Sequence, residues 1–491
     1  MKFFIEVRAF RKVKDKTIRL DFILVLTFSF DFLFLCMSNK LPPDLVRHLQ
    51  GDPHFDYNAF VSIHDKEQKT SSIRINPGKK FDLSLLDIDR EIPWCEGGFY
   101  LNKRPIFTLD PLFHAGCYYS QEASSMFLNF VIRELKLNIE PIRALDLCSA
   151  PGGKATLLNS TLHKDSLLVA NEIIKSRASI LRDNLVKWGN ANVIVSNNDP
   201  SSFARLPGYF DLAVIDAPCS GSGMFHKDHD AMDEWSMANV KLCSERQKRI
   251  IADSIVTVKT NGVIFYSTCS YSKEENEDIV DWMIDTFNLE SISVSVDPSW
   301  GIEVGKSDKH EAASYRFYPH KVAGEGFFCA ILKRKGDVPN FSLKKVKMEK
   351  NAAPQSLAQG WANMEGLYSF LYHDLLHIFP KAYEQDLTAL QKVLYLKNAG
   401  TEIGRVVGKD LIPSHDLALS NRIHKDIPFL DLDLEEMLTY LRKESLPPSV
   451  NKKEISGWII VRYEGMDLGW IKAMPNRINN YYPKEVRIAN L

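Results

Sequence analysis

Short apolar runs that alternate with helical patterns dominate the middle of the chain. Five of these runs read as β-strands: IRALDLC from residue 142, SLLVANE from 166, ANVIVSNND from 191, FDLAVIDAP from 210 and NGVIFYSTC from 261. Such alternation is typical of an α/β fold with a doubly wound parallel sheet. Four of the five runs end in an acidic residue, a cysteine or both. Ligands of doubly wound sheets bind beyond the carboxyl ends of the strands, so these residues mark the expected site.

Changes in this pattern divide the chain, because it contains no internal repeat or low-complexity block. Before the doubly wound region, LPPDLVRHLQ reads as a helix and SSIRINPGKK as a strand, which indicates a small α/β module. After it, LYSFLYHDLLHIF and LEEMLTYLRK are expected to be helical, and the segment from Gly457 to Ile488 reads as short strands of a small β-barrel. The expected parts are an upstream extension (1–36), an N-terminal module (37–115), the doubly wound domain (116–335), a basic linker (336–350) and a C-terminal region (351–491).

The segment from Leu20 to Cys36, LDFILVLTFSFDFLFLC, is strongly apolar and follows a basic stretch. A signal sequence or a membrane anchor could have this composition. However, Asp21 and Asp31 interrupt it, and no small-residue cleavage site follows. We expect residues 1–36 to be an upstream extension outside the functional protein, with an interfacial or membrane anchor as the alternative.

The composition is that of a globular protein, with 45% hydrophobic and 25% charged residues among 491. It excludes disordered, collagen-like and small disulfide-rich proteins. The 61 Lys and Arg residues against 62 Asp and Glu residues give a net charge of −1, so contact with nucleic acid would need local basic patches. The eight cysteines form no CxxC pair and no Cys/His cluster, which favours a reducing, cytoplasmic compartment and no metal site.

The first strand-like run leads into a turn of small residues before a helical stretch begins. The turn consists of Cys148, Ser149, Ala150, Pro151, Gly152, Gly153 and Lys154. Turns of this kind let a ligand approach the backbone closely. This one is neither a P-loop nor a GxGxxG turn, because Cys148 stands where a P-loop has its first glycine. A tight turn without a ligand is the alternative.

Acidic residues end the next two strand-like runs. Glu172 lies 26 residues after Asp146, where doubly wound nucleotide-binding folds place a carboxylate on ribose hydroxyls. Asp199 ends the third run, where a carboxylate can accept a hydrogen bond from the exocyclic amine of adenine. Either acid alone could instead be a turn or helix cap. Together with the turn, they indicate a pocket for an adenosine-containing ligand without a phosphate cradle, and S-adenosylmethionine fits that description.

Two cysteines end the fourth and fifth runs: Cys219 in DAPCSGSG and Cys269 in STCSYS. They would lie side by side if those strands pair. A lone cysteine is usually an inert core residue, and we keep that interpretation for Cys148, Cys243 and Cys329. Cys219 and Cys269 lie in small-residue loops at the expected mouth of the site, which favours a chemical role. A disulfide between them is the competing interpretation, and a reducing compartment disfavours it.

Segments at these positions resemble motifs of the RNA cytosine-C5 methyltransferases, the NOL1/NOP2/Sun family. LDLCSAPGGKAT, DAPCSGSGMF and STCSYSKEENE are similar to its motifs I, IV and VI, GCYYSQEASS to the segment before motif I, and RFYPHKVAGEGFFCAIL to its closing strands. The C-terminal part further resembles the bacterial 16S rRNA methyltransferase F branch, in which a PUA-like RNA-binding domain follows the catalytic domain. The resemblance spans the whole doubly wound region and departs from the family at no catalytic motif position.

The resemblance implies a Rossmann-like domain that transfers a methyl group from S-adenosylmethionine to C5 of a cytosine in 16S rRNA. It implies that Cys269 is the nucleophile that attacks C6, that Cys219 assists product release and that Asp216 contacts the cytosine ring. Lys154 would place positive charge near the thiolate. The implied cofactor contacts are Cys148, Ser149, Ala150, Pro151, Gly152, Gly153, Lys154, Glu172, Asp199 and Asp216.

An RNA substrate must be held on both sides of an unstacked cytosine. We therefore expect the N-terminal module with Arg74 and Asn76, the basic linker and the C-terminal domain to bind RNA, although the linker could simply be solvated. The expected partner is 16S rRNA within the 30S subunit, with no DNA and no membrane, and the expected state is a monomer. The alternatives are a cytosine-C5 methyltransferase of tRNA or 23S rRNA, and a ribosome-assembly factor with a vestigial methyltransferase fold.

Overall fold

A computed structural model describes residues 41–50, 55–65, 70–225, 227, 230–339, 341–343, 355–372, 374–446 and 455–489. The expected upstream extension, residues 1–36, lies outside the described residues. Residues 344–350, at the end of the expected linker, lie outside them too. No helix among the described residues combines the length and the apolar character that crossing a bilayer requires.

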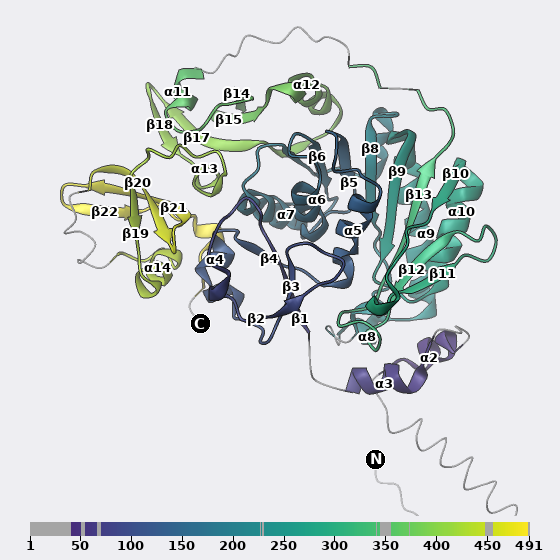
Figure 1. Cartoon of the computed structure of the whole chain (residues 1–491). Helices are drawn as coiled ribbons and strands as arrows, with labels where there is room; N and C mark the ends of the chain where they lie inside the picture. The colour runs from purple at the N-terminus through teal and green to yellow at the C-terminus, as the bar shows by residue number, and fades with distance from the viewer. Residues whose placement is uncertain are drawn as a thin grey trace, which may run out of the picture.

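Five parallel strands form the centre of the largest sheet, and each of the five strand-like runs supplies one. They are β5 (Arg143–Asp146), β6 (Leu167–Asn171), β7 (Val193–Ser196), β8 (Phe210–Asp216) and β9 (Val258–Thr268). Their spatial order is β9-β8-β5-β6-β7, with parallel pairing throughout. The chain winds outward from β5 in one direction and then resumes on its other side with β8. The prediction of a doubly wound sheet is therefore confirmed (Figure 1).

Antiparallel strands extend this sheet at both edges. On one side, β13 (Phe327–Arg334) pairs with β9, and β12 (Ala313–Phe317) and β11 (Glu303–Lys306) follow, while β10 (Leu289–Ile292) pairs with the second half of β13. On the other side, β16 (Leu396–Ala399) pairs with β7. The strand β16 comes from the C-terminal region, beyond the boundary expected at residue 335. The doubly wound sheet is thus completed by a segment that the sequence assigned to another part.

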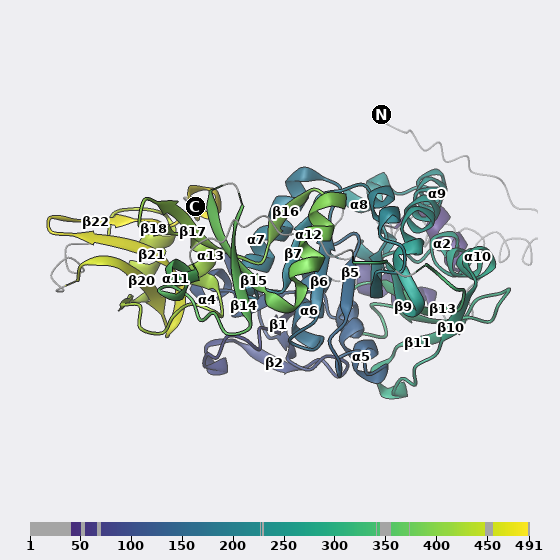
Figure 2. The same cartoon turned by 90° about the horizontal axis from the view of Figure 1, so that it is seen from above.

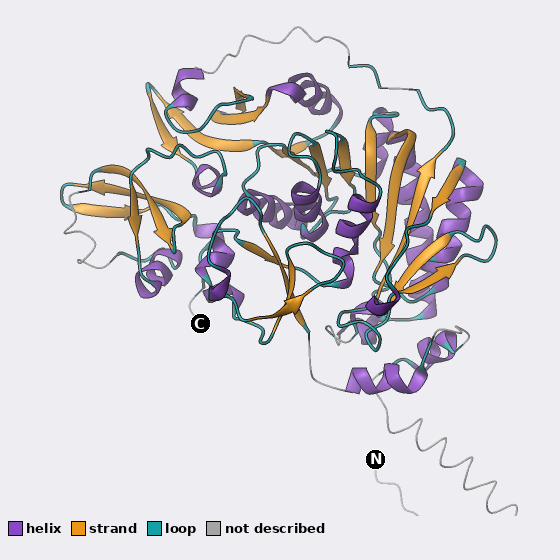
Figure 3. Cartoon of the chain, in the orientation of Figure 1, coloured by secondary structure: helices purple, strands orange, loops and turns teal. Residues whose placement is uncertain are grey.

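Helices cover both faces of the sheet, as Figure 3 shows. One apolar cluster contains buried side chains of the sheet and of α5 (Phe127–Glu134), α6 (Gly153–Thr161) and α7 (Lys175–Trp188). The other contains side chains of α9 (Met237–Ser254), α10 (Glu277–Phe287) and α12 (Glu384–Val393). Burial on both faces explains why the central strands read as continuous apolar runs rather than alternating ones.

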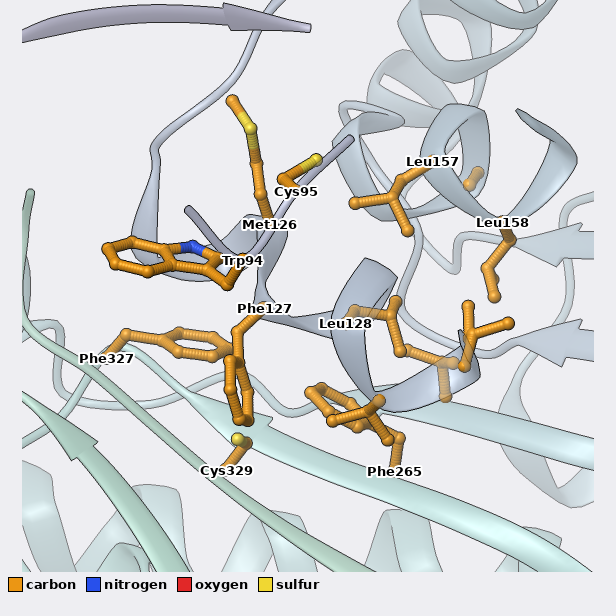
Figure 4. Close-up of a cluster of buried hydrophobic side chains, with 14 of the residues drawn as sticks. Trp94, Cys95, Met126, Phe127, Leu128, Leu157, Leu158, Phe265, Phe327 and Cys329 are labelled. Atoms are coloured by element: carbon orange, nitrogen blue, oxygen red, sulfur yellow. The ribbon is translucent and has the colours of Figure 1, made fainter. Parts of the chain in front are cut away.

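The N-terminal module, in the part of the chain that the structure describes, is an antiparallel sheet with three short α-helices. Its strand order is β2-β3-β1-β4, and α2 and α3 precede the sheet. The elements are α2 (Pro43–Leu49), α3 (Tyr57–Asp65), β1 (Ser71–Ile75), β2 (Ile88–Glu91), β3 (Gly98–Leu101), α4 (Pro111–His114) and β4 (Tyr118–Ser120). Trp94, which precedes β3, packs with Phe127 and Phe327 in the cluster drawn in Figure 4. The module and the doubly wound domain therefore share a core.

Arg74 and Asn76 do not face RNA, in contrast to the expectation from the sequence. The Arg74 side chain is 2% exposed, donates hydrogen bonds to Gln121, Thr156 and Ser160, and lies 4.5 Å from the centre of the Trp188 ring. Asn76 is equally buried and donates to the carbonyl oxygens of Gly116 and Trp188. Both residues connect the module to the catalytic domain, because a buried polar side chain must find its partners inside the protein.

The C-terminal region contains two further four-stranded sheets. The first has the order β14-β15-β17-β18 and the second β19-β20-β21-β22. The elements are α11 (Gln355–Gln359), β14 (Leu367–Tyr372), β15 (Leu375–Pro380), β17 (Thr401–Val407), β18 (Asp410–Pro413), α13 (His415–Leu419), β19 (Phe429–Asp431), α14 (Leu434–Leu441), β20 (Gly457–Tyr463), β21 (Met466–Met474) and β22 (Arg477–Asn480). The expected helix in LEEMLTYLRK and the expected strands after Gly457 are confirmed.

The segment LYSFLYHDLLHIF forms a hairpin of β14 and β15, so the prediction of a helix there was wrong. Asp374 adopts a left-handed backbone conformation, with φ of 63°, at the turn. Aspartate tolerates this conformation better than most residues. A left-handed residue ends a helix but suits a tight turn. Packing of aromatic rings on neighbouring strands, such as Tyr368 against Phe379, replaced the helical contacts that the apolar spacing suggested.

Two buried ion pairs join the C-terminal region to the catalytic domain. Arg143 on β5 donates to Asp386 on α12, with N and O 2.6 Å apart, and Arg182 on α7 donates to Asp416 on α13, also at 2.6 Å. Viewed from above, the sheet of β19 to β22 forms one end of the molecule and β10 and β13 lie toward the other (Figure 2). The C-terminal region is therefore attached by specific contacts and is not a loosely tethered domain.

Replacing Arg74 tests whether it is structural. Arg74→Ala would leave the side-chain oxygens of Gln121 and Thr156 without the hydrogen-bond donor that Arg74 supplies in the protein interior. We therefore expect the free energy of unfolding to fall by about 2–4 kcal/mol. Urea unfolding measures this, with Arg47→Ala, whose side chain is 75% exposed, as the control. Equal stability of the two variants, together with weaker RNA binding by Arg74→Ala, would contradict the structural role.

Candidate active site

The predicted site residues converge at the carboxyl ends of β5, β6, β8 and β9. The strands β5 and β8 are neighbours in the sheet. Between them, the order in which the chain adds strands to the sheet changes direction. A crevice forms at such a switch point because the loops leaving the two strands diverge to opposite faces. The turn after β5 and the cysteine loops after β8 and β9 border this position.

Hydrogen bonds to the neighbouring strands hold the turn after β5 in place. Ser149 donates its backbone N–H to the carbonyl of Asn171 and its hydroxyl to Asp146. Asp146 is fully buried, and burial raises the pKa of its carboxyl group to about 7. Gly152 has φ of 116°, a left-handed conformation that favours glycine, and stands immediately before α6. The exposed edge of the turn is thus a preformed backbone surface.

Glu172 lies next to this turn, after β6. Its side chain accepts a hydrogen bond from the backbone N–H of Ile174 and lies 3.7 Å from the guanidinium of Arg177. The adjacent Ile173 is 51% exposed. Ile173 carries no motif signal in the sequence, but an exposed isoleucine beside a carboxylate offers an apolar surface of the kind that suits an adenine ring.

Asp199 lies after β7 and caps a short helix. Its carboxylate accepts hydrogen bonds from the backbone N–H and the hydroxyl of Ser201, and these bonds lower the pKa of the carboxyl group. The capping role that the sequence left open is therefore present. The side chain is nevertheless exposed, so its second oxygen remains accessible to a ligand.

These residues fit S-adenosylmethionine. A carboxylate at Glu172 suits the ribose hydroxyls, Ile173 suits the adenine face, and the turn offers backbone groups at close range. The turn itself is apolar or uncharged from Cys148 to Gly153. A methyl donor that carries no phosphate needs no cationic cradle, which agrees with this composition.

The two cysteines predicted to be neighbours are in contact. The Sγ atoms of Cys219 and Cys269 lie 3.0 Å apart, and both thiols are free. A disulfide would hold the sulfurs at about 2.05 Å, so the competing interpretation does not describe this structure. Parallel pairing of β8 with β9 sets Asp216 beside Ser267 and brings the two loops that follow to the same place.

Lys154 and Asp216 form an ion pair beside the thiols. Nζ of Lys154 lies 2.9 Å from Asp216 and 5.1 Å from the centre of the Phe327 ring, and Ser267 donates a hydroxyl hydrogen bond to Asp216. Burial lowers the pKa of Lys154, but the charges of Asp216, Asp146 and Cys269 outweigh burial and raise it. The ammonium group therefore stays charged and lies close enough to Cys269 to interact with its sulfur.

Comparison with known proteins agrees with this geometry. The family model described as 16S rRNA methyltransferase RsmB/F matches residues 135–333, the N-terminal domain of 16S rRNA methyltransferase RsmF matches 41–123, and the methyltransferase RsmF PUA domain matches 428–488. The small-subunit rRNA methyltransferase F of Vibrio vulnificus strain YJ016 is 30% identical over 451 residues, 86% of this chain and 92% of that protein. This chain belongs to the 16S rRNA methyltransferase F family.

Other members of the methyltransferase F family match to a similar extent. The protein from Vibrio atlanticus is 28% identical over 484 residues, which is 92% of this chain and 98% of the relative. Among solved structures, NSun6 from Pyrococcus horikoshii has a TM-score of 0.51 and 19% identity, and the match covers 61% of this chain and all but 1% of that one. The chain is an S-adenosylmethionine-dependent methyltransferase with a Rossmann-like fold and a C-terminal PUA domain.

The thiol of Cys219 is held in its protonated form. The pKa of Cys219 is raised well above its ordinary value by the hydrogen bond to Cys269, by burial and by the charges of Cys269 and Glu275. Cys219 therefore retains its proton at neutral pH. Since the thiolate is the reactive form of cysteine, the protonated Cys219 is a poor nucleophile.

Alkylation tests the protonation of Cys219. Iodoacetamide at neutral pH is expected to modify Cys219 roughly tenfold more slowly than Cys269, since only the thiolate reacts and Cys219 keeps its proton. Peptide mass spectrometry after timed quenching measures both rates in the same sample. Lys154→Met should slow the modification of Cys269 by removing the neighbouring positive charge. Equal rates at the two cysteines would show that the proton is not held at Cys219.

Proposed function

We propose that the protein transfers a methyl group to C5 of a cytosine in 16S rRNA through a covalent bond between Cys269 and C6. The observation that carries this proposal is the pair of free thiols, 3.0 Å apart, beside a lysine–aspartate ion pair at the switch point of the sheet. The relatives named small-subunit rRNA methyltransferase F support 16S rRNA as the substrate.

The chemistry requires a nucleophile because C5 of cytosine is a poor nucleophile by itself. Attack of the Cys269 thiolate on C6 makes C5 enamine-like, so that it can form a bond to a methyl group. S-adenosylmethionine, when bound, supplies that methyl group. Loss of the C5 proton and departure of the Cys269 thiolate then restore the aromatic ring. In this proposal, Cys219 assists the departure step from the position of a protonated thiol.

The ion pair has two roles in this scheme. Asp216 would bind N3 and the exocyclic amine of cytosine, and one of the hydrogen-bonding partners must carry a proton for this contact. Lys154 would hold Asp216 in place and stabilise negative charge on the nearby sulfur. Because Lys154 lies at the start of α6, after β5, and Asp216 is the last residue of β8, the cytosine would be bound between β5 and β8.

The cofactor would be held by the turn and the acids beside it. Its contacts in this proposal are Cys148, Ser149, Ala150, Pro151, Gly152, Gly153, Lys154, Glu172, Asp199 and Asp216, as the sequence resemblance implied, with Ile173 as an addition. The turn is rigid and Ile173 is already exposed, so little rearrangement of these residues would accompany binding.

Asp199 allows its two roles to be separated. Asp199→Asn keeps an N-cap, so stability should be preserved, but the amide presents a different hydrogen-bonding pattern to an adenine amine. We expect about a tenfold increase in the Kd for S-adenosylmethionine, measured by isothermal titration calorimetry. Asp165→Asn, at an exposed turn remote from the cofactor residues, is the control. An unchanged Kd would assign Asp199 to capping alone.

RNA would be held by the PUA domain and the linker, since Arg74 and Asn76 are buried. The partner in this proposal is 16S rRNA within the 30S subunit, the enzyme acts as a monomer in the cytoplasm, and neither DNA nor a membrane takes part. Attraction to RNA phosphates should make binding weaker at higher salt concentration.

Methyl transfer from labelled S-adenosylmethionine tests the reaction. Unmethylated 30S subunits should be methylated, and naked tRNA and 23S rRNA should not. Cys269→Ala should reduce the rate by at least about 10⁴-fold because no other group can attack C6. Cys219→Ala should accumulate an RNA–protein adduct on denaturing gels, because release fails after attack.

Several outcomes would contradict the proposal. Activity that survives in Cys269→Ala would exclude this residue as the nucleophile. Methylation of tRNA or 23S rRNA instead of 30S subunits would correct the substrate. No methyl transfer to any RNA by the wild type would favour an assembly factor with a vestigial catalytic fold.

A further inference from the structure

Glu275 is a fully buried acidic residue directly beneath the two reactive thiols. It lies six residues after Cys269, at the end of a 3-10 helical turn formed by residues Lys273–Glu275. In the sequence it belongs to the charged run KEEN, within the segment STCSYSKEENE that is similar to motif VI. Its neighbours Lys273 and Glu274 are partly exposed, with side chains 42% and 37% accessible. Glu275 alone in this turn points into the protein.

The carboxylate of Glu275 bridges the two cysteine loops. One oxygen accepts a hydrogen bond from the backbone N–H of Ser220, 2.7 Å away, and the other accepts one from the Ser220 hydroxyl at 2.6 Å. The second oxygen also accepts a hydrogen bond from the hydroxyl of Ser270. Ser220 follows Cys219 and Ser270 follows Cys269 in the chain. A single side chain therefore fixes the residue immediately after each thiol.

The bridge is itself anchored to β9. The hydroxyl of Tyr266 donates to the backbone carbonyl of Glu275 at 2.6 Å. The next residue, Asn276, donates to the carbonyl of Ser270 and accepts from the hydroxyl of Thr268. Because Tyr266 and Thr268 both belong to β9, which ends one residue before Cys269, the position of the carboxylate is set by the sheet rather than by the surface.

A buried carboxylate is costly, and its burial calls for a physical reason. Burial raises the pKa of Glu275, whereas the hydrogen bonds from Ser220 and Ser270 lower it without cancelling the effect of burial. A neutral side chain could join two serines at a lower desolvation cost. A charged acceptor forms stronger hydrogen bonds and can hold two loops that would otherwise diverge to opposite faces of the sheet.

We propose that Glu275 is a positioning residue that holds the Cys219 and Cys269 loops together at the distance the reaction needs. The inference deepens the proposed function and rests on it, since it concerns the same two thiols. Glu275 does not contact the cytosine or the cofactor in this proposal. It acts through the backbone of Ser220 and through the hydroxyl groups of both serines.

The charge of Glu275 has a second effect on the pair. It contributes to the raised pKa of Cys219, after the hydrogen bond to Cys269, burial and the charge of Cys269. Other titratable groups that interact with the pair are Asp216 on β8, Lys154 on α6, Tyr266 on β9, Cys243 on α9 and Tyr271, two residues after Cys269. Removing the charge while keeping the shape should therefore make Cys219 ionise at lower pH.

Two variants separate geometry from charge. Glu275→Ala removes the bridge. Glu275→Gln keeps an oxygen for the Ser220 N–H, and its amide can donate to the serine hydroxyls, so the bridge survives without the charge. Glu274→Gln is the matched control because Glu274 is the preceding residue and contacts His48 instead of the cysteine loops.

Oxidation with diamide measures the geometry without requiring methyl transfer. Diamide takes two electrons and two protons from the thiol pair and becomes the hydrazine as the Cys219–Cys269 disulfide forms. We expect Glu275→Ala to form this disulfide at least about tenfold more slowly than the wild type, and Glu275→Gln and Glu274→Gln to stay within about twofold. Binding of S-adenosylmethionine with unchanged Kd shows that each variant is folded.

Glu275→Ala and Glu275→Gln should also differ from each other in methyl-transfer activity and in the pH dependence of Cys219 alkylation. Glu275→Ala should lose about 10²-fold in single-turnover methyl transfer to 30S subunits, because misplacement by about 1 Å has this effect. Glu275→Gln should retain most of the activity. In a Cys269→Ser background, Glu275→Gln should shift the pH profile of Cys219 alkylation to lower pH, an effect that a purely structural role would not produce.

The inference fails if Glu275→Ala forms the disulfide at the wild-type rate while remaining folded. If Glu275→Ala does not fold, Ser270→Ala removes one arm of the bridge, and an unchanged disulfide rate in that variant would equally overturn the inference. A slower disulfide rate together with a wild type that methylates no RNA would refute the proposed function and leave the positioning role intact.

Discussion

The parallel pairing of β8 with β9 is the constraint on which the active site depends. In-register pairing sets the last residues of the two strands side by side, so the loops that follow begin about one strand spacing apart. Every later contact of the site builds on this start: the two thiols, the ion pair on Asp216 and the Glu275 bridge. A slip of the register by one residue would turn the side chains at these strand ends to the opposite face.

Loop packing then brings the site to close contact. Gly223 donates its backbone N–H to the carbonyl of Cys269, and Gly326 donates to the carbonyl of Gly223. A β-carbon on Gly223 would lie 2.4 Å from the carbonyl oxygen of Gly326 and 2.7 Å from that of Cys269. The glycines are thus required by the approach of three backbone segments. The small residues of DAPCSGSG have a structural reason in addition to any role in binding RNA.

Much of the fold and the site could be predicted because the signals are local. Apolar runs buried on both faces predicted the five central strands, and residues at strand ends predicted which side chains would meet. Contacts distant in sequence left no such signal. Arg74 is basic and was expected to bind RNA, yet it is buried by Thr156, Ser160 and Trp188. Glu275 stands in the segment similar to motif VI, yet its hydrogen bond with Ser220, 55 residues earlier, left no local signal. The hairpin of β14 and β15 carried apolar residues at spacings that also suit a helix.

The strand β16 makes the C-terminal region a structural part of the catalytic sheet. An uncovered edge strand offers free backbone N–H and C=O groups to any other extended chain. The edge of β7 is covered by a segment that is synthesised after every other strand of this sheet. The growing chain therefore carries β7 as an open edge until residues 396–399 arrive, and β16 then takes the edge position before the PUA domain is made.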